Sequence, residues 1–171
     1  MNIKPINQTI LYGLGNIFNE IINLNKLNIM PNKILFSGPK GIGKSTLAYH
    51  IINYLFSKNE PEAYKLDNYT INSNNKSYKL VCNNSHPNFY LIDLFDEKKN
   101  IEISQIRKMI NYTYKSSFNN SLKIILIDNI EYLNDSSSNA LLKIIEEPNE
   151  NCYFILIHNI NKKISETLKS R

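Results

Sequence analysis

The fold is decided by the stretch Ser37-Gly38-Pro39-Lys40-Gly41-Ile42-Gly43-Lys44-Ser45-Thr46. It fits the phosphate-binding pattern G-x-x-x-x-G-K-[ST] at every fixed position. The three glycines let the backbone turn tightly, with some residues at positive φ, and bring N–H groups close to phosphate oxygens. Lys44 supplies an ammonium group for the β- and γ-phosphates, and the Ser45 hydroxyl can ligate Mg²⁺. We therefore predict a nucleotide phosphate site formed by Gly38, Pro39, Lys40, Gly41, Ile42, Gly43, Lys44, Ser45 and Thr46, rather than a plain glycine-rich turn.

Both flanks of this motif support the prediction. Residues 33–36 are a short apolar run that predicts a strand, and residues 46–55 predict a helix. A helix N-terminus aimed at bound phosphate is the expected arrangement, because the helix dipole favours negative charge there.

The whole chain has the composition of a soluble globular protein, with 42% apolar and 20% charged residues. Its 171 residues fit one domain, 1–171, that is large enough to bury a core. No run approaches the length of a membrane-spanning helix, and the N-terminus lacks the build of a signal peptide. A cytoplasmic location is the default expectation.

Cysteine usage and net charge give no sign of a disulfide framework, a zinc site or a basic nucleic-acid-binding patch. Cys82 and Cys152 are isolated, so the sequence predicts neither a disulfide framework nor a zinc cluster. The formal charge of +5 comes mainly from lysines scattered among many Asn and Ile residues, which indicates a compositional bias rather than a basic patch. Direct nucleic-acid binding therefore has no support from charge alone.

Strand and helix patterns alternate along the rest of the chain. Strands are predicted at 89–93, 122–128 and 153–158, and helices over 7–27, from Ser104 as N-cap to about 116, and over 136–147. Residues 57–79 are polar without a clear period and predict a long surface insertion, and residues 95–100 predict a charged loop. The alternation predicts an α/β fold with a mainly parallel sheet and right-handed crossovers.

An acidic residue ends the most strongly β-branched of these strands. A buried strand that ends in an acid after a phosphate loop is typical of a nucleotide-hydrolysing site, so Asp128 is predicted to hold Mg²⁺ opposite Ser45. Many ATPases of this architecture carry Glu directly after that Asp, where it polarises the attacking water. Here the position is Asn129, which cannot act as a general base. The prediction is nucleotide binding with slow or absent hydrolysis; hydrolysis by the displaced Glu131 is the less favoured alternative.

Several segments of the chain carry a family resemblance. Residues 138–148 (SNALLKIIEEP) resemble the N-A-L-L-K-x-L-E-E-P signature of bacterial clamp-loader subunits of the AAA+ superfamily. Residues 35–44 are similar to the family's L-F-x-G-P-x-G-x-G-K, and residues 154–159 followed by 167–171 resemble its sensor strand and the start of its Ser-Arg-Cys motif. The resemblance spans about residues 5–171. Within the family, the Asp-Asn pair and the absent Cys cluster are most similar to delta-prime subunits, because gamma/tau subunits usually keep Asp-Glu and a four-Cys zinc module.

The resemblance implies a three-layer P-loop NTPase fold, the AAA+ core, with ATP and Mg²⁺ as cofactors and no zinc. It implies that Asn159 is the sensor near the γ-phosphate. It also implies that Arg171 is an arginine finger that acts in trans on the neighbouring subunit's ATP, and that the helix 136–147 lies near that subunit interface. The implied partners are gamma/tau and delta subunits, with the sliding clamp and primed DNA reached through the complex, and no membrane. The family's lid and collar domains would follow Arg171, so we interpret the chain as a partial one.

Three functions compete on these observations. The favoured one is a clamp-loader subunit with a weak or silent ATPase, which acts as a stator during ATP-driven loading of the clamp onto DNA. The second is a hydrolysis-competent AAA+ ATPase, a motor like gamma/tau. The third is a small nucleotide kinase, which should show an Arg-rich lid; the chain has only Arg107 and Arg171, which argues against it.

Overall fold

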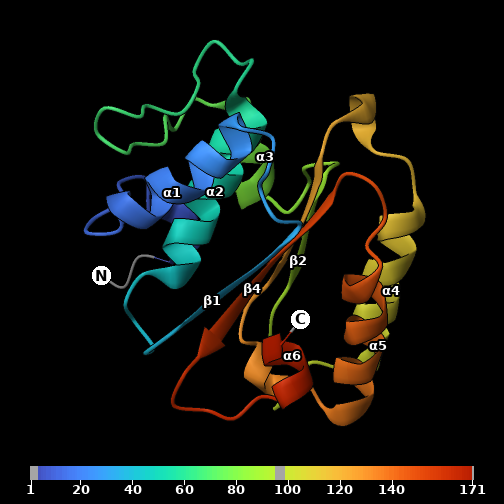
Figure 1. Cartoon of the computed structure of the whole chain (residues 1–171). Coiled ribbons are helices and arrows are strands. Elements are labelled where there is room, and N and C mark those ends of the chain that lie inside the picture. The colour runs from blue at the N-terminus through green and yellow to red at the C-terminus, as the bar shows by residue number, and fades with distance from the viewer. Residues whose placement is uncertain (1–3, 95–98, 171) are drawn as a thin grey trace. The chain divides into compact units, whose positions relative to one another are not determined.

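The structure is a computed structural model that describes residues 4–94 and 99–170. The chain divides into two compact units, Met1–Pro31 with Gly43–His86 and Asn32–Ile42 with Pro87–Arg171. The first unit contains η1 (Pro5–Asn7), α1 (Gly15–Lys26), α2 (Lys44–Ser57) and α3 (Lys76–Cys82) (Figure 1). The second contains the strands β1 (Lys33–Gly38), β2 (Phe89–Ile92), β3 (Lys123–Ile127) and β4 (Cys152–Asn159), the helices α4 (Ile103–Tyr114), α5 (Asp135–Glu146) and α6 (Glu166–Ser170), and the short 3-10 helices η2 (Phe118–Asn120) and η3 (Ile130–Tyr132).

The second unit is built on a parallel sheet with the strand order β1-β4-β3-β2. Each neighbouring pair of strands is parallel. Because β4 lies between β1 and β3, the strand that leads into the phosphate loop and the strand that ends before Asp128 are not neighbours. The carboxyl ends of all four strands meet at one edge, where ligands bind in open α/β sheets. The predicted α/β class with its parallel sheet is confirmed.

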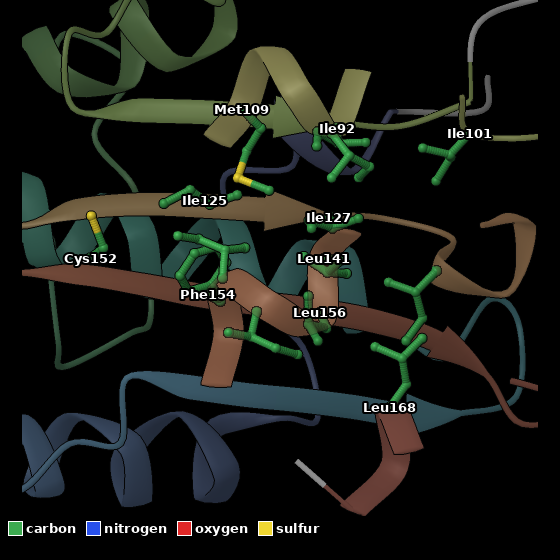
Figure 2. Packing of buried hydrophobic residues seen from close by; sticks show 14 residues of the cluster. Ile92, Ile101, Met109, Ile125, Ile127, Leu141, Cys152, Phe154, Leu156 and Leu168 are labelled. Carbon is green, nitrogen blue, oxygen red and sulfur yellow. The ribbon is translucent and has the colours of Figure 1, made fainter. Parts of the chain in front are cut away.

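The core of the second unit lies between the sheet and α4 and α5. All five residues of β3 are buried, Lys123 included, and the apolar run from Ile124 to Ile127 is what predicts a strand covered on both faces. Alternate residues of β3 and β4 point to one face and meet residues from the two helices (Figure 2). This cluster of buried residues comprises Ile92, Ile101, Ile106, Met109, Ile125, Ile127, Ile130, Leu141, Ile144, Ile145, Cys152, Phe154, Leu156 and Leu168.

Local capping groups set where the two covering helices begin. The N-cap of α5 is Asn134, whose Oδ1 accepts a hydrogen bond from the Ser137 N–H at 2.8 Å. The predicted cap of α4 at Ser104 is wrong, since the N-cap is Glu102. The Glu102 N–H donates to Oε1 of Gln105 at 2.9 Å, one half of a capping box, so the helix begins before Ser104.

The first helix is shorter than its apolar spacing predicts. Residues 7–27 are predicted as one helix, whereas α1 begins at Gly15. The residues before it pair with a distant stretch instead: the Leu11 N–H donates to the Tyr69 carbonyl at 3.1 Å, and the Ile71 N–H donates to the Thr9 carbonyl at 2.8 Å. Because these backbone groups bond to another segment, they are not available for an α-helical ladder.

The predicted surface insertion over 57–79 is wrong in two respects. Its end forms part of α3, and several of its side chains are buried, among them Ile71 at 2% exposed and Asn75 at 0%. The Glu60 carboxylate bonds the Asn75 side chain at 2.7 Å, the Ser77 hydroxyl at 2.5 Å and the backbone N–H groups at the start of α3. A polar sequence thus folds inward because its polar groups satisfy one another.

A buried lysine closes the C-terminal end of α4. Lys123, which is 3% exposed, donates from Nζ to the carbonyls of Tyr112 at 3.0 Å, Thr113 at 3.2 Å and Lys115. The ammonium also lies 4.9 Å from the centre of the Tyr112 ring. A cation at a helix C-terminus satisfies carbonyls that lack an intrahelical partner and interacts favourably with the helix dipole.

We expect Lys123→Met to destabilise the protein by about 2 kcal/mol, because it removes the donor from three carbonyls and leaves them in a mostly buried site. Urea unfolding measures the change. The exposed Lys108 of α4 supplies the control, and Lys108→Met should change stability by less than about 0.5 kcal/mol. Equal stability of the two variants would contradict this role of Lys123.

Among the described residues, no helix is both long and apolar enough to cross a membrane.

Candidate functional site

The phosphate loop has the backbone conformation that its glycines predict. Gly41 and Gly43 have φ angles of +90° and +91°, in the left-handed region that favours glycine. Gly38 is the last residue of β1 and pairs in register with Asn159 of β4. Gly43 is the N-cap of α2, so Lys44 and Ser45 are the first two residues of a 14-residue helix.

Within the first unit, the chain before α1 lies against the loop. A Cβ added at Gly43 would come within 3.2 Å of Leu14 Cδ1, which shows how closely Leu14 approaches the loop backbone. The preceding residues are held to α2 by His50, whose ring nitrogens lie 3.0 Å from the Gln8 carbonyl and 2.8 Å from the Tyr64 hydroxyl. Burial lowers the pKa of His50 to about 4, so the ring is neutral at pH 7; Nε2–H donates to the carbonyl and Nδ1 accepts from Tyr64.

Within the second unit, the ends of β1 and β4 are joined by side chains. The Ser37 hydroxyl and His158 Nδ1 are 2.9 Å apart, and His158 Nε2 lies 2.8 Å from the Lys162 carbonyl. Because a carbonyl can only accept, Nε2 carries a proton and donates to Lys162. His158 is 2% exposed and therefore fixes the edge of the sheet at which Asn159 lies.

The two residues after β3 are oriented by hydrogen bonds. The Asp128 N–H donates to the Ile92 carbonyl at 2.9 Å, and Asp128 Oδ1 accepts from the Asn129 N–H at 2.8 Å. Asn129 adopts a left-handed conformation with φ of 59°, which turns its side chain toward the end of β2. There its Nδ2 donates to Oδ1 of Asp93 at 2.8 Å.

Glu131, the alternative general base, is bonded within the same unit. Its Oε2 accepts from the Asn159 N–H at 3.2 Å, which links η3 to the end of β4. Glu131 would have to exchange this bond for an attacking water to serve as a base. Asn129 therefore places an amide directly after Asp128, and the carboxylate of Glu131 is bonded to the backbone at the end of β4.

Asn159, the predicted sensor, has its side chain oriented by the turn that follows β4. Its Oδ1 accepts from the Asn161 N–H at 3.2 Å, and the Lys162 N–H donates to its carbonyl at 2.9 Å. An oxygen fixed in this way directs the Nδ2 amide group, a donor, away from the turn. That chemistry matches a residue that would donate to a phosphate oxygen.

Arg171, the predicted arginine finger, lies outside the described residues, as does part of the predicted charged loop at 95–98. Asp93 and His158 were not predicted as site residues, although both carry a recognisable signal: each is a polar residue at the end of an apolar run predicted to be a buried strand.

Each unit offers chemical groups of the kind that bind a nucleotide phosphate or a divalent cation. A Cβ at Gly41 would meet no atom of the described residues within 4 Å, so the loop backbone is open to close approach by a group such as phosphate. Lys44 of the first unit offers an ammonium of the kind that binds phosphate, and Ser45 offers a hydroxyl oxygen. Asp128 of the second unit offers a carboxylate, an oxygen ligand of the kind that Mg²⁺ prefers. Among the described residues, no group of three or more His, Cys, Asp and Glu side chains gathers in a way that could hold a metal ion by protein ligands alone.

Sequence comparison relates the chain to subunits of one replication enzyme. A family model described as DNA polymerase III, delta subunit, matches residues 14–171. DNA polymerase III subunit delta' of Buchnera aphidicola subsp. Baizongia pistaciae is 30% identical over 177 residues, which cover 100% of this chain and 49% of that protein. Subunit delta' of Pseudomonas aeruginosa is 28% identical over 80% of this chain and 40% of its own length. The chain thus spans about half the length of the curated relatives that it matches.

Structure comparison supports the same fold. The gamma subunit-related protein of DNA polymerase III from Thermotoga maritima is similar with a TM-score of 0.63 and 21% identity, over 89% of this chain and 43% of that one. The Holliday junction branch migration motor RuvB from Thermotoga maritima is similar with a TM-score of 0.53 and 16% identity, over 98% and 47%. The expected AAA+ fold class is confirmed. By the family model and by its relatives, the chain belongs to the DNA polymerase III delta subunit family.

Proposed function

We propose that the chain is the nucleotide-binding part of a DNA polymerase III clamp-loader subunit of the delta' kind. It would bind ATP with residues 38–46 and Mg²⁺ with Ser45 and Asp128, and it would hydrolyse ATP slowly or not at all. The slow or absent hydrolysis is proposed from the Asn129 side chain, which donates to Asp93 at 2.8 Å. The position at which related ATPases place a water-polarising Glu therefore holds an amide that is already engaged with a neighbouring strand.

A subunit that retains ATP without turning it over would act mainly on its neighbours. Bound ATP would order the phosphate loop and the sheet edge, with Asn159 as the donor toward the γ-phosphate. Lys44 and Mg²⁺ would neutralise the negative charge of the phosphates. This neutralisation stabilises bound ATP even where no hydrolysis follows. Partners of this subunit would be gamma/tau and delta, with the sliding clamp and primed DNA reached through the assembled complex, in the cytoplasm.

The catalytic contribution of this subunit would be Arg171, acting in trans. An arginine that reaches a neighbour's γ-phosphate stabilises charge in the transition state and increases kcat by about 10³–10⁵. The role is proposed from the order of the motifs along the chain, since Leu168, Lys169 and Ser170 precede Arg171 as in the family's arginine-finger segment.

The test is a clamp loader assembled with this subunit in full length, in which only the neighbouring gamma-type subunit keeps an intact phosphate-loop lysine. We expect Arg171→Ala to lower the single-turnover rate of ATP hydrolysis by about 10³-fold without loss of assembly. Lys169→Ala is the matched control, because Lys169 is exposed on α6 and pairs with Glu166 at 3.4 Å. Equal rates for Arg171→Ala and Lys169→Ala would refute the proposed finger.

A second candidate, a motor subunit like gamma/tau that hydrolyses its own ATP, depends on Glu131. Gamma subunits are among the relatives: that of Buchnera aphidicola subsp. Acyrthosiphon pisum is 28% identical over 94% of this chain. In this case the isolated chain would turn over ATP, and Glu131→Gln would abolish the reaction. We favour the silent site because Glu131 Oε2 is bonded to the Asn159 backbone.

A further inference from the structure

We propose that Tyr69 is a positioning residue for nucleotide binding. Together with its neighbours Thr70 and Ile71 it binds the chain on both sides of Leu14, and these contacts, which we call the clasp, hold Leu14 against Gly43 of the phosphate loop. This inference rests on the proposed ATP binding. It assigns a role to the stretch 57–86, which the phosphate-loop chemistry leaves without one.

Tyr69 is held in a conformation that an aromatic residue rarely adopts. Its φ is 52°, in the left-handed region, where an aromatic side chain is a genuine outlier. Such a conformation persists only where the surroundings impose it, and it is concentrated at functional sites. Here the surroundings are a short antiparallel pairing: Lys65 and Thr70 exchange both N–H···O bonds at 3.0 Å, which sets the turn that contains Tyr69.

The backbone on both sides of Tyr69 binds the segment before α1. The Tyr69 carbonyl accepts from the Leu11 N–H at 3.1 Å, the Ile71 N–H donates to the Thr9 carbonyl at 2.8 Å, and Ile10 pairs with Thr70. The clasp thus fixes residues 9–11, three residues before Leu14, by backbone hydrogen bonds that do not depend on side-chain identity.

The Tyr69 side chain fixes the other side of Leu14. Its ring lies over Gly15, where an added Cβ would come within 2.9 Å of two ring atoms, so a side chain at this position would push the ring away. The hydroxyl accepts from Asn19 Nδ2 at 2.7 Å, and the ring makes an edge contact with Phe18 at 5.8 Å between centroids. Tyr69 therefore holds the chain both before and after Leu14.

Leu14 transmits this restraint to the phosphate loop. Its Cδ1 lies 3.2 Å from the position of a Cβ at Gly43, and Gly43 begins α2 with a φ of +91°. The phosphate-contacting residues Lys44 and Ser45 follow directly. A loop already held in its binding conformation loses less conformational entropy when the phosphates bind, so the clasp should raise the affinity for ATP.

The experiment measures the Kd for a fluorescent ATP analogue with Mg²⁺, together with the thermal midpoint of each variant. We expect Tyr69→Ala to raise Kd about 10-fold. Gly15→Ala should raise Kd by a similar factor, because the new methyl group would push the Tyr69 ring away from α1 while Tyr69 itself is unchanged. Tyr69→Phe keeps the ring over Gly15 and loses only the bond to Asn19, so its Kd should stay within about twofold of the wild type.

A matched control separates positioning from stability. Val81 is buried in α3 and takes part in none of the clasp contacts, so Val81→Ala should lower the thermal midpoint and leave Kd unchanged. Should Tyr69→Ala fail to fold, Gly15→Ala alone decides between the two outcomes. Amide hydrogen exchange supplies an independent measurement. If the contacts around Tyr69 favour ATP binding, bound ATP must stabilise those contacts in turn, and it should slow exchange at the Leu11 and Ile71 amides.

The outcomes are distinguishable. A wild type that binds no ATP would refute the proposed function itself. A wild type that binds ATP, with Gly15→Ala and Tyr69→Ala both within twofold of its Kd, would refute the clasp and leave ATP binding intact. A Val81→Ala variant that loses affinity as strongly as Gly15→Ala would also refute it, since the effect would then follow general stability.

Discussion

Asn129→Glu is expected to destabilise the protein by about 3 kcal/mol and to leave ATP turnover at the level of the wild type. The substitution supplies the carboxylate that related ATPases place after the metal-binding Asp. It also forces a glutamate into a left-handed backbone with φ of 59°, which costs roughly 1–2 kcal/mol. The Glu carboxylate would also replace the amide that donates to Asp93 in the wild type. The two carboxylates would then repel one another, which adds about 1–2 kcal/mol to the loss of stability.

Three companion variants separate these two costs by urea unfolding. Asn129→Asp tolerates the left-handed backbone and isolates the like-charge repulsion. Asn129→Glu combined with Asp93→Asn reverses the polarity of the pair, because the introduced amide can donate to the introduced carboxylate; it should recover about half of the lost stability. Asp93→Asn alone removes the acceptor charge and provides the reference for the double variant.

Two results would contradict this account of Asn129. One is an Asn129→Glu variant as stable as the wild type. The other is a double variant no more stable than Asn129→Glu, which would show that the hydrogen bond to Asp93 does not govern this position. Turnover gained only in the double variant would show that the strand-end pair, and not Asn129 alone, keeps the site silent.

Lys44→Ala is expected to weaken ATP binding by at least about 100-fold. Hydrogen bonds to charged groups are worth about 1.5–3 kcal/mol each, and Lys44 would serve both the β- and γ-phosphates. A loss of about 2.8 kcal/mol corresponds to 100-fold in Kd. The thermal midpoint without nucleotide is measured alongside Kd, because Lys44→Ala removes the methylenes of the side chain together with its ammonium in the first turn of α2.

Lys40 offers a matched control within the same loop. It carries the same charge and is exposed, but it lies at a variable position of the motif and would contribute only its backbone. Lys40→Ala should therefore change Kd less than threefold in the same titration. Equal losses for the two lysine variants would indicate nonspecific attraction between the loop and an anion, and would contradict a specific phosphate site.

The sheet and its capped helices could be predicted because their signals are local. The apolar β-branched run over 122–128 indicates a buried strand, and Asn134 lies where a side-chain oxygen can cap the next helix. The glycines at 41 and 43 likewise carry their positive φ values within a short motif. The backbone conformation of the glycine-rich loop and the positions of Asp128 and Asn159 at the ends of their strands were therefore accessible from the sequence.

The remaining features depend on partners that are distant in the chain. Residues 9–11 have a helical spacing, but their backbone pairs with residues 69–71. The polar stretch after α2 folds inward because Glu60 meets Asn75 and Ser77, and no local period reports such a network. The engagement of Asn129 with Asp93 depends likewise on β2 and β3 being neighbours, which residue patterns alone do not specify.

The central claim, that the chain binds ATP at a site that does not turn it over, is tested most directly by measuring both quantities on one sample. The Kd for Mg²⁺-ATP and the rate of phosphate release are determined for the wild type and for Lys44→Ala. We predict saturable binding by the wild type, its loss in Lys44→Ala, and phosphate release that is the same in both proteins. Phosphate release by the wild type that disappears in Lys44→Ala would contradict the claim, and its loss in Glu131→Gln as well would identify a working ATPase.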